Sequence, residues 1–326
     1  MTESLVKALV DPWTSRWKST AIGAALLFWL TGAVCYMLTH STAAAVCATS
    51  RSAGSPFWCV ITPYPKAAAI ALPLLAVAVV ATTAAVCARL APVMITFLAE
   101  ASWSRLPFLR PLARCRIRRH EKIRKHYGEH AEMASKRTPN DWVEAARDDA
   151  VIESRRDYAR GELVVGPTRL ANIFTATAAR IEEAYGLNLQ TCWPYLVAVL
   201  PPESRADLSA QAAAFQLRAQ GLLLALALPL WSLLLGISWW TAVLWLVATV
   251  LLIAGHRSMI DAARSYLTEI EALMGLHRRA LYDGLGFPRP ASTESEPATG
   301  KGLSDYLNAN TATPTELQWP DSPAPS

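Results

Sequence analysis

The chain has 326 residues, of which 52% are hydrophobic and only 17% are charged. Soluble domains usually carry about 25% charged residues, so this composition argues against a wholly soluble protein and indicates that part of the chain lies in lipid. The formal net charge is +5, but the basic residues are distributed very unevenly along the chain.

The first two predicted membrane spans form a hairpin near the N-terminus. The stretch from Thr20 to Leu38 has nineteen residues and no charge, about the length that a helix needs to cross a bilayer core. The second span runs from Ala67 to Ala88 and is closed by Arg89, whose side chain we expect to reach the headgroups. Apolar sequence resumes after Arg89, and we interpret it as an interfacial continuation. These features predict an N-terminal segment at 1–19, a first transmembrane hairpin at 20–98 and a connecting loop at 40–66.

A third apolar region, 221–255, has thirty-five uncharged residues, too many for one span and barely enough for two. Gly236-Ile237-Ser238 is a turn signal inside it. We therefore predict two short spans near 221–236 and 239–255, with Trp239 and Trp240 at the far interface. One long tilted helix is the alternative.

The distribution of Lys and Arg predicts the orientation. The stretch 99–220 holds nineteen of these residues, whereas the loop 40–66 holds only Arg51 and Lys66. Because basic residues stay on the inner side of a membrane, we expect a multi-pass protein of the plasma membrane with both termini cytoplasmic and the loop outside.

Two of the six cysteines, Cys47 and Cys59, fall in the predicted outer loop. The outer compartment permits a disulfide between them, and two unpaired thiols are the alternative. The cysteines show no CxxC motif and no zinc-site spacing, so no metal is expected from them.

None of the predicted spans contains Asp, Glu, Lys or Arg in its interior. Intramembrane charges usually mark ion or proton pathways, so this pattern argues against an ion-coupled transporter. A passive pore formed by oligomerisation stays open.

Residues 105–125 hold nine Lys or Arg and one Glu. Such a cluster beside a span is typical of contact with anionic lipid headgroups, and we favour lipid over nucleic acid because acidic sequence follows the cluster. His126 and His130 lie nearby, but "HEKIRKH" is not a HExxH motif, and no metal site is predicted. The expected headgroup contacts are Arg110, Arg114, Arg116, Arg118, Arg119, Lys122, Arg124 and Lys125.

The rest of the cytosolic region 99–202 reads as three helices. Mixed charges at 140–160 indicate a solvated helix. Thr168 is a good helix cap, the apolar residues after it have helical spacing, and Gly186 is the expected stop. Pro194 then starts a short helix that Pro201-Pro202 ends.

Residues 203–287 are predicted to form a long helical hairpin that contains the last two spans. Its first arm has apolar residues spaced by four and three, and its second arm carries a heptad seam. The two arms should therefore pack antiparallel, although the same seam could pair two copies in a homo-oligomer. The first arm's positions are Leu208, Ala212, Phe215, Ala219 and Leu222, and the seam is Ile260, Ala263, Leu267, Ile270, Met274, His277 and Leu281.

The segment 288–326 is rich in Pro, Ser, Thr and Glu and is predicted to be a disordered tail. Its one short apolar patch, "GLSDYL" at 302–307, could dock elsewhere. The expected fold is thus an all-α membrane protein with four transmembrane helices in two hairpins, a helical cytosolic module between them and a disordered C-terminal tail.

The stretch "PTRLANIFTATAARIEEAYGLNLQTCWPYLVAVLP" resembles the central block of a family of actinobacterial membrane proteins of unknown function. "LHRRALYDGLGFPRP" and "GLSDYL" resemble that family's C-terminal segments. In this chain Ala171 stands where the family usually has Gly, Asn188 where it has Asp, and Tyr195 where it has Arg. The last two differences argue against acid–base catalysis at those positions. The resemblance implies the membrane architecture and no particular chemistry. The matching residues are Pro167, Thr168, Arg169, Leu170, Asn172, Ile173, Tyr185, Gly186, Leu187, Trp193, Pro194, Leu196, Leu200 and Pro201.

The chain has no phosphate loop, GxSxG or HExxH motif. We therefore expect a non-enzymatic scaffold, regulator or oligomeric effector that needs no cofactor. One alternative is an oligomeric pore. The other is an enzyme at the membrane face that binds an anionic substrate near a helix N-terminus. Its pocket would draw on Arg169, Asn172, Tyr185 and Trp193, with Glu182 and Glu183 beside them. Arg169 and Asn172 could instead tie their helix to a neighbouring loop.

Overall fold

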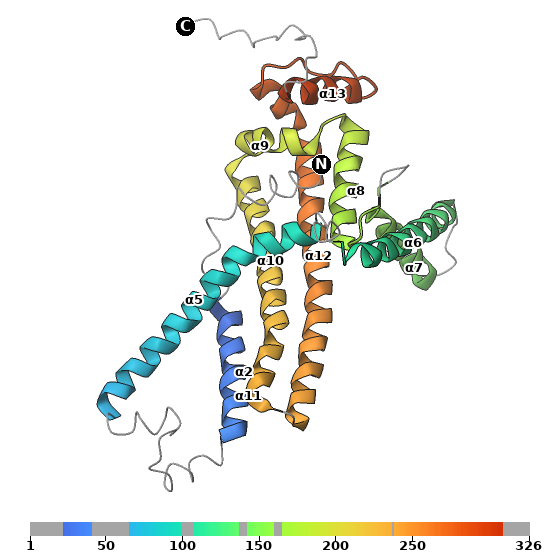
Figure 1. The fold of residues 1–326 in the computed structure, drawn as a ribbon. Coiled ribbons are helices and arrows are strands. Elements are labelled where there is room, and N and C mark those ends of the chain that lie inside the picture. The colour runs from blue at the N-terminus through green and yellow to red at the C-terminus, as the bar shows by residue number, and fades with distance from the viewer. Residues whose placement is uncertain are drawn as a thin grey trace, which may run out of the picture. The chain divides into compact units, whose positions relative to one another are not determined.

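The structure is a computed structural model that describes residues 22–40, 65–99, 107–136, 142–159, 165–236 and 238–308. All regular elements in these ranges are helices, which confirms the all-α class (Figure 1). In chain order they are α2 (Ile22–His40), α5 (Pro65–Ala99), α6 (Arg110–Lys136), α7 (Trp142–Arg156), α8 (Arg169–Tyr185), α9 (Leu189–Val199), α10 (Pro202–Ala227), the 3-10 helix η3 (Leu228–Trp231), α11 (Ser232–Leu235), α12 (Trp239–Gly284) and α13 (Glu296–Leu307).

The chain divides into two compact units. The first, which we call the helical module, comprises Met1–Thr14, Met94–Ala213 and Ile260–Ser326. The second, which we call the apolar bundle, comprises Ser15–Val93 and Ala214–Met259. Helices α5, α10 and α12 contribute residues to both units.

By length and composition, three helical stretches in the described residues could cross a membrane: Pro73–Ala99, Pro202–Leu235 and Trp239–Gly284. Four such helices were predicted from the sequence, and the described residues contain three. Helix α2 has 19 residues, and its apolar part, Ile22–Tyr36, is shorter than the three candidate spans. Helix α5 continues without a break through Arg89, where an interfacial continuation was expected.

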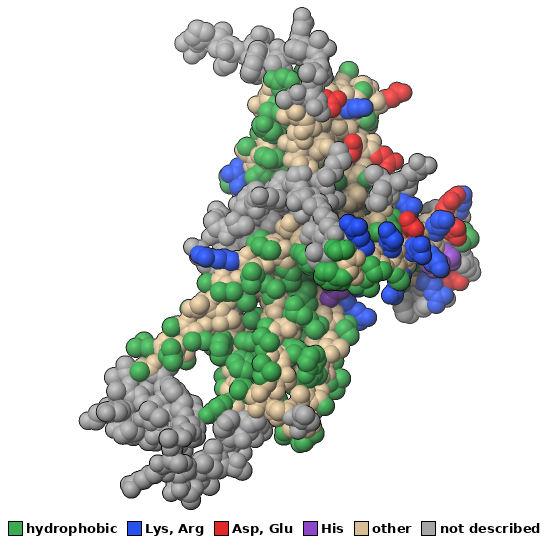
Figure 2. Space-filling model, viewed as in Figure 1, with side chains coloured by type: hydrophobic (Ala, Val, Ile, Leu, Met, Phe, Trp, Pro, Cys, Tyr) green, Lys and Arg blue, Asp and Glu red, His purple; other side chains and the backbone are tan. Residues whose placement is uncertain are grey.

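The outer faces of the apolar bundle are covered by large aliphatic side chains. Leu27, Leu226, Leu233 and Leu246 are all more than 60% exposed, and hydrophobic side chains cover much of the visible surface of the bundle (Figure 2). Contiguous apolar surface of this kind is rare on soluble monomers, whereas in a bilayer it meets acyl chains.

Aromatic packing fixes α2 inside the bundle. The rings of Phe28 and Trp231 lie 5.2 Å apart between centroids, and Gly32 packs directly against the Trp231 ring, where a Cβ would overlap it. Trp29 donates its indole N–H to the Thr83 hydroxyl on α5 at 2.9 Å. These contacts link α2 to η3 and α5.

The predicted break in the third apolar region is present. Helix α11 ends at Leu235 and α12 begins at Trp239, so a single continuous helix is ruled out. Gly236 between them has φ of +60°, a conformation that favours glycine. Leu222 on α10 contacts Gly255 on α12. The two helices, joined through this turn, run side by side in opposite directions here (Figure 1).

Local signals in the sequence set the ends of α8 and α9. The Thr168 hydroxyl accepts the Ala171 N–H at 3.0 Å, and Gly186 ends α8 in the left-handed conformation, both as predicted. Helix α9 begins five residues earlier than predicted, because the Asn188 side chain caps it by accepting the Thr191 N–H at 3.2 Å. Pro194 therefore lies inside α9 and not at its start.

The apolar seam of α12 is buried within one chain. Ile270 and Met274 are fully buried, and only His277 among the seam residues is partly exposed. All five predicted positions on the facing arm, Leu208 to Leu222, are buried as well. The antiparallel arrangement in a single chain thus accounts for the heptad pattern, and a second copy is not needed to cover the seam.

The prediction of a disordered tail from residue 288 is wrong for the part that the structure describes. Residues Glu296–Leu307 form α13, which packs against α8 and α9. The apolar patch at 302–307, which was expected to be able to dock, lies in α13, and its Leu303 is fully buried. Close backbone contact, which composition does not reveal, also holds this helix. A Cβ at Gly300 would overlap the Tyr185 carbonyl oxygen, and the Ser304 hydroxyl accepts the Asn188 N–H at 2.8 Å. Residues 309–326 lie outside the described residues.

The close contact at Gly300 predicts opposite effects for two glycines of α13. Gly300→Ala should lower the free energy of unfolding by about 2 kcal/mol, the usual cost of overpacking, and should release α13. Gly302→Ala should raise it by roughly 0.5–1 kcal/mol through helix propensity, because the nearest atom to a Cβ there is the Phe287 ring at 3.8 Å. Hydrogen exchange of the α13 amides and thermal unfolding would measure both. Equal effects of the two substitutions would contradict this docking geometry.

Candidate functional site

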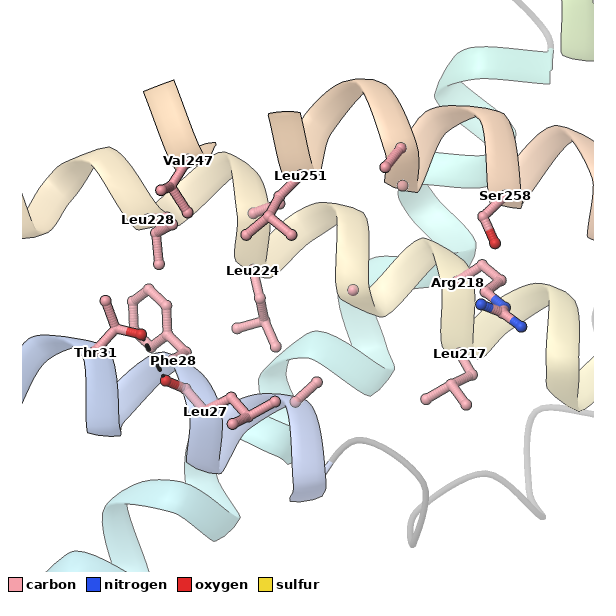
Figure 3. A pocket seen from close by; sticks show the side chains of 15 residues that line it. Leu27, Phe28, Thr31, Leu217, Arg218, Leu224, Leu228, Val247, Leu251 and Ser258 are labelled. Carbon is pink, nitrogen blue, oxygen red and sulfur yellow. Dashed lines mark hydrogen bonds between the residues drawn. The ribbon is translucent and has the colours of Figure 1, made fainter. Parts of the chain in front are cut away.

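An apolar groove lies in the apolar bundle between α2, α10 and α12 (Figure 3). Its cavity volume is about 710 Å³, within the usual range of small-molecule sites. Small residues on α10 and α12, among them Gly221, Ala225, Ala254 and Gly255, open the space between the helices. The groove was not predicted from the sequence, because its walls come from three separate apolar helices.

The two ends of this groove differ in polarity. Arg218 and Ser258 lie at one end, and Phe28, Leu228 and Val247 lie at the other (Figure 3). The Arg218 side chain is exposed and forms no ion pair with any described residue. Inside the groove, the Thr31 hydroxyl donates to the Leu27 carbonyl oxygen of its own helix at 2.9 Å. The groove can therefore hold an apolar chain and one anionic group at its mouth.

In the helical module, the buried carboxylate of Asp157 accepts hydrogen bonds from two arginines. Asp157 is only 2% exposed. Arg264 binds it in a bidentate manner, with Nε donating to Oδ1 at 2.8 Å and Nη2 donating to Oδ2 at 2.6 Å. Arg169 adds a bond from Nε to Oδ2 at 2.7 Å. One carboxylate thus fastens the end of α7 to the start of α8 and to α12, which are far apart in the sequence.

Beside Asp157, the Tyr158 hydroxyl and His120 Nδ1 are 2.9 Å apart and join the end of α7 to α6. Burial raises the pKa of Tyr158 to about 12. Burial, followed by the charges of Arg116 and Arg119, lowers the pKa of His120. Both groups are therefore neutral at physiological pH, and the pair is a neutral hydrogen bond that positions α6.

Three charged residues on α12 form ion pairs at a spacing of seven. Arg264 pairs with Asp157, Glu271 pairs with Arg180 at 3.0 Å, and Arg278 pairs with Glu296 of α13 at 2.5 Å. Because seven residues are close to two helical turns, these side chains lie along one face of α12. They tie α7, α8 and α13 in turn to the same helix.

The four predicted anion-pocket residues do not form one site. Arg169 is bound to Asp157, and Asn172 accepts the Gly166 N–H at 2.7 Å and donates to the Gly166 carbonyl at 3.2 Å. Both lie at the start of α8, whereas Tyr185 is its last residue and stacks against Arg278, whose guanidinium carbon is 4.9 Å from the ring centroid. Trp193 is fully buried in α9. Glu182 and Glu183 are exposed. The hydrogen bonds of Arg169 and Asn172 tie α8 to the segment that precedes it.

The basic residues predicted to contact headgroups lie on α6. All eight are exposed except Arg124, which is partly buried. Apart from Arg124, these side chains form no ion pair with any residue in the described ranges. Figure 2 shows Lys and Arg side chains gathered over α6.

The remaining predicted site, the Cys47–Cys59 pair, lies outside the described residues. Among those described, Cys35, Cys87 and Cys192 are buried, Cys115 on α6 is exposed, and none of these four forms a disulfide. No group of three or more His, Cys, Asp or Glu side chains that could hold a metal occurs in the described part of the chain.

Sequence reasoning missed Asp157, Arg264 and Arg218. Asp157 and Arg264 are 107 positions apart, so no local pattern links them. Arg218 lies just before the apolar region 221–255, and no local pattern places it beside a groove. A useful signal was available for Arg264, Glu271 and Arg278, because their spacing of seven repeats that of the apolar seam.

Neither the protein-family models, the curated proteins nor the solved structures with which the chain was compared gave a match.

The two arginines on Asp157 predict a large cost for neutralising that carboxylate. Asp157→Asn should lower the free energy of unfolding by about 3 kcal/mol, because it leaves Arg169 and Arg264 without their buried partner. Asp261→Asn is the matched control, since the Asp261 side chain is 69% exposed and makes one bond to Arg264 at 3.3 Å. It should cost less than about 1 kcal/mol. Chemical unfolding in detergent, followed by circular dichroism, would measure both, and a similar loss in the two variants would refute the central role of Asp157.

Proposed function

We propose that this chain is an integral, multi-pass protein of the plasma membrane that acts as a non-enzymatic scaffold or regulator. In this proposal the helical module lies at the cytoplasmic face and presents α6 to anionic headgroups. The three helices of membrane-crossing length and the apolar outer face of the bundle support insertion.

We propose that α2 is the fourth span. Its 19 residues are about 28 Å long at 1.5 Å per residue, close to the roughly 30 Å of hydrocarbon in a bilayer. With four spans, both termini lie on the same side. The nineteen basic residues at 99–220 favour the cytoplasm as that side.

The observation that carries the proposed role is the contrast between α6 and the rest of the module. The charges around Asp157, Glu271 and Glu296 are paired across helices, so they serve the fold. The eight basic side chains predicted to contact headgroups, in contrast, are exposed apart from Arg124, and the other seven form no ion pair with a described residue. Each such charge near an anionic surface stabilises contact by roughly 1 kcal/mol.

Apolar side chains at the start of α6 strengthen this assignment. Phe108, just before the helix, is 70% exposed, and Leu112 is 51% exposed. Exposed apolar residues interleaved with Arg110 and Arg114 are typical of helices that lie in the headgroup region.

The test uses the exposed Cys115 on α6 as the site of an environment-sensitive fluorophore, with Cys47 and Cys59 replaced by Ser in the full chain. In nanodiscs that contain phosphatidylglycerol, the emission should shift to the blue relative to discs of phosphatidylcholine alone. About 0.5 M salt should reverse the shift, because screening weakens exposed charge interactions.

A pair of triple variants supplies the control. Arg114→Gln/Arg118→Gln/Lys122→Gln should abolish the difference between the two disc types. Arg147→Gln/Arg279→Gln/Lys301→Gln removes the same charge from exposed positions elsewhere in the module and should leave it intact. Equal emission in both disc types for the parent chain, or loss in both triple variants, would count against headgroup contact through α6.

A further inference from the structure

We propose that the groove between α2, α10 and α12 binds one anionic phospholipid. An acyl chain of this lipid lies along the apolar walls, and its phosphate lies at Arg218. This inference rests on the proposed insertion of the apolar bundle into a membrane.

The length of the groove fits one leaflet. From Leu217 on α10 to Leu228, the first residue of η3, it extends about 16 Å at 1.5 Å per residue. Along α12 it extends from Val247 to Ser258, which is about 16 Å. Half of a hydrocarbon core of roughly 30 Å is about 15 Å. A lipid of one leaflet can therefore fill the groove while its headgroup stays at the mouth.

The walls provide room for a chain and no competing polar group. A Cβ added at Gly221 would meet no atom within 4 Å, so this wall faces open space. Leu224 and Leu251 line the middle of the groove (Figure 3). The Thr31 hydroxyl is satisfied by Leu27 of its own helix, so an apolar occupant leaves no buried donor unpaired.

The charge at the mouth selects an anionic lipid. Arg218 is the one ionisable side chain among the described lining residues, and no acidic residue lies there to neutralise it. A guanidinium offers two parallel N–H donors that match a phosphate, and the Ser258 hydroxyl lies at the same end of the groove (Figure 3). An occupant with this pairing has an apolar chain attached to a phosphate, which is the chemistry of an anionic phospholipid.

The experiment measures lipid retained by the full chain. The protein is reconstituted with equal phosphatidylglycerol and phosphatidylcholine, extracted in mild detergent and weighed by native mass spectrometry. One phosphatidylglycerol should remain per chain, preferred about fivefold over phosphatidylcholine. A phosphatidylglycerol with a photoreactive acyl chain should cross-link to residues 217–228 and 247–258, and cross-links confined to α6 would overturn the assignment.

Two variants, each with a matched control, test the walls and the mouth. Gly221→Phe fills the groove and should lower retention at least tenfold, the effect of losing about two methylene contacts. Gly23→Phe is its control, because a Cβ at Gly23 also meets nothing within 4 Å and Gly23 does not line the groove. Arg218→Gln should remove the preference for phosphatidylglycerol. Arg257→Gln, which removes an exposed charge outside the groove, should preserve it.

Several outcomes would overturn the proposal: full retention in Gly221→Phe, equal retention of the two lipids by the parent chain, or a second copy of the chain in place of lipid. If Gly221→Phe does not fold, as judged by circular dichroism, Ala254→Leu replaces it as the filling variant. Extraction of the parent chain by alkaline carbonate would refute membrane insertion itself. Resistance to carbonate together with no retained lipid would refute only the groove.

Discussion

The rest of the structure depends on α12 being one uninterrupted helix of 46 residues. Backbone groups in a bilayer must be satisfied within their own helix, and the apolar half of α12 meets this requirement without a break. The same helical register then continues through Ile260 to Gly284. Side chains seven residues apart therefore stay on one face, and the apolar seam and the three ion pairs follow from that register.

The helical module combines these ion pairs with an apolar core in which Phe174, Trp193, Tyr266 and Tyr282 are fully buried. Asp157 is buried yet fully bonded, because two arginines occupy both of its oxygens. Removing water from a carboxylate is costly unless charged donors replace it, so this arrangement specifies which helices meet. The groove has the opposite character, since its one charge, Arg218, has no described partner inside the protein. Paired charges therefore hold the fold, and unpaired ones at α6 and Arg218 are available to bind.

Local chemistry predicted much of the fold. Four features followed from local sequence signals: the Thr168 cap, the Gly186 stop, the break at Gly236 and the heptad seam. Each could be predicted because it depends on the residue types and spacing within one element or turn. Contacts between segments that are distant in the sequence could not be predicted in this way. Helix α13 is ordered by backbone contact between Gly300 and Tyr185 and by the Arg278–Glu296 pair, neither of which alters composition. The prediction of an anion pocket around Arg169 was wrong for a related reason. The side chain of Arg169 is bound to Asp157, and the sequence does not reveal that contact.

We propose that the chain crosses the membrane four times and holds the helical module in the cytoplasm. The most direct measurement is labelling of single-cysteine variants in intact cells by a membrane-impermeant maleimide, with epitope tags at both termini. We expect Cys47 to react in intact cells, and Cys115 and both tags to become accessible only after permeabilisation. An N-terminal tag that is accessible in intact cells while Cys115 is protected would mean that α2 does not cross. Reaction of Cys115 from outside, with Cys47 protected, would contradict the orientation.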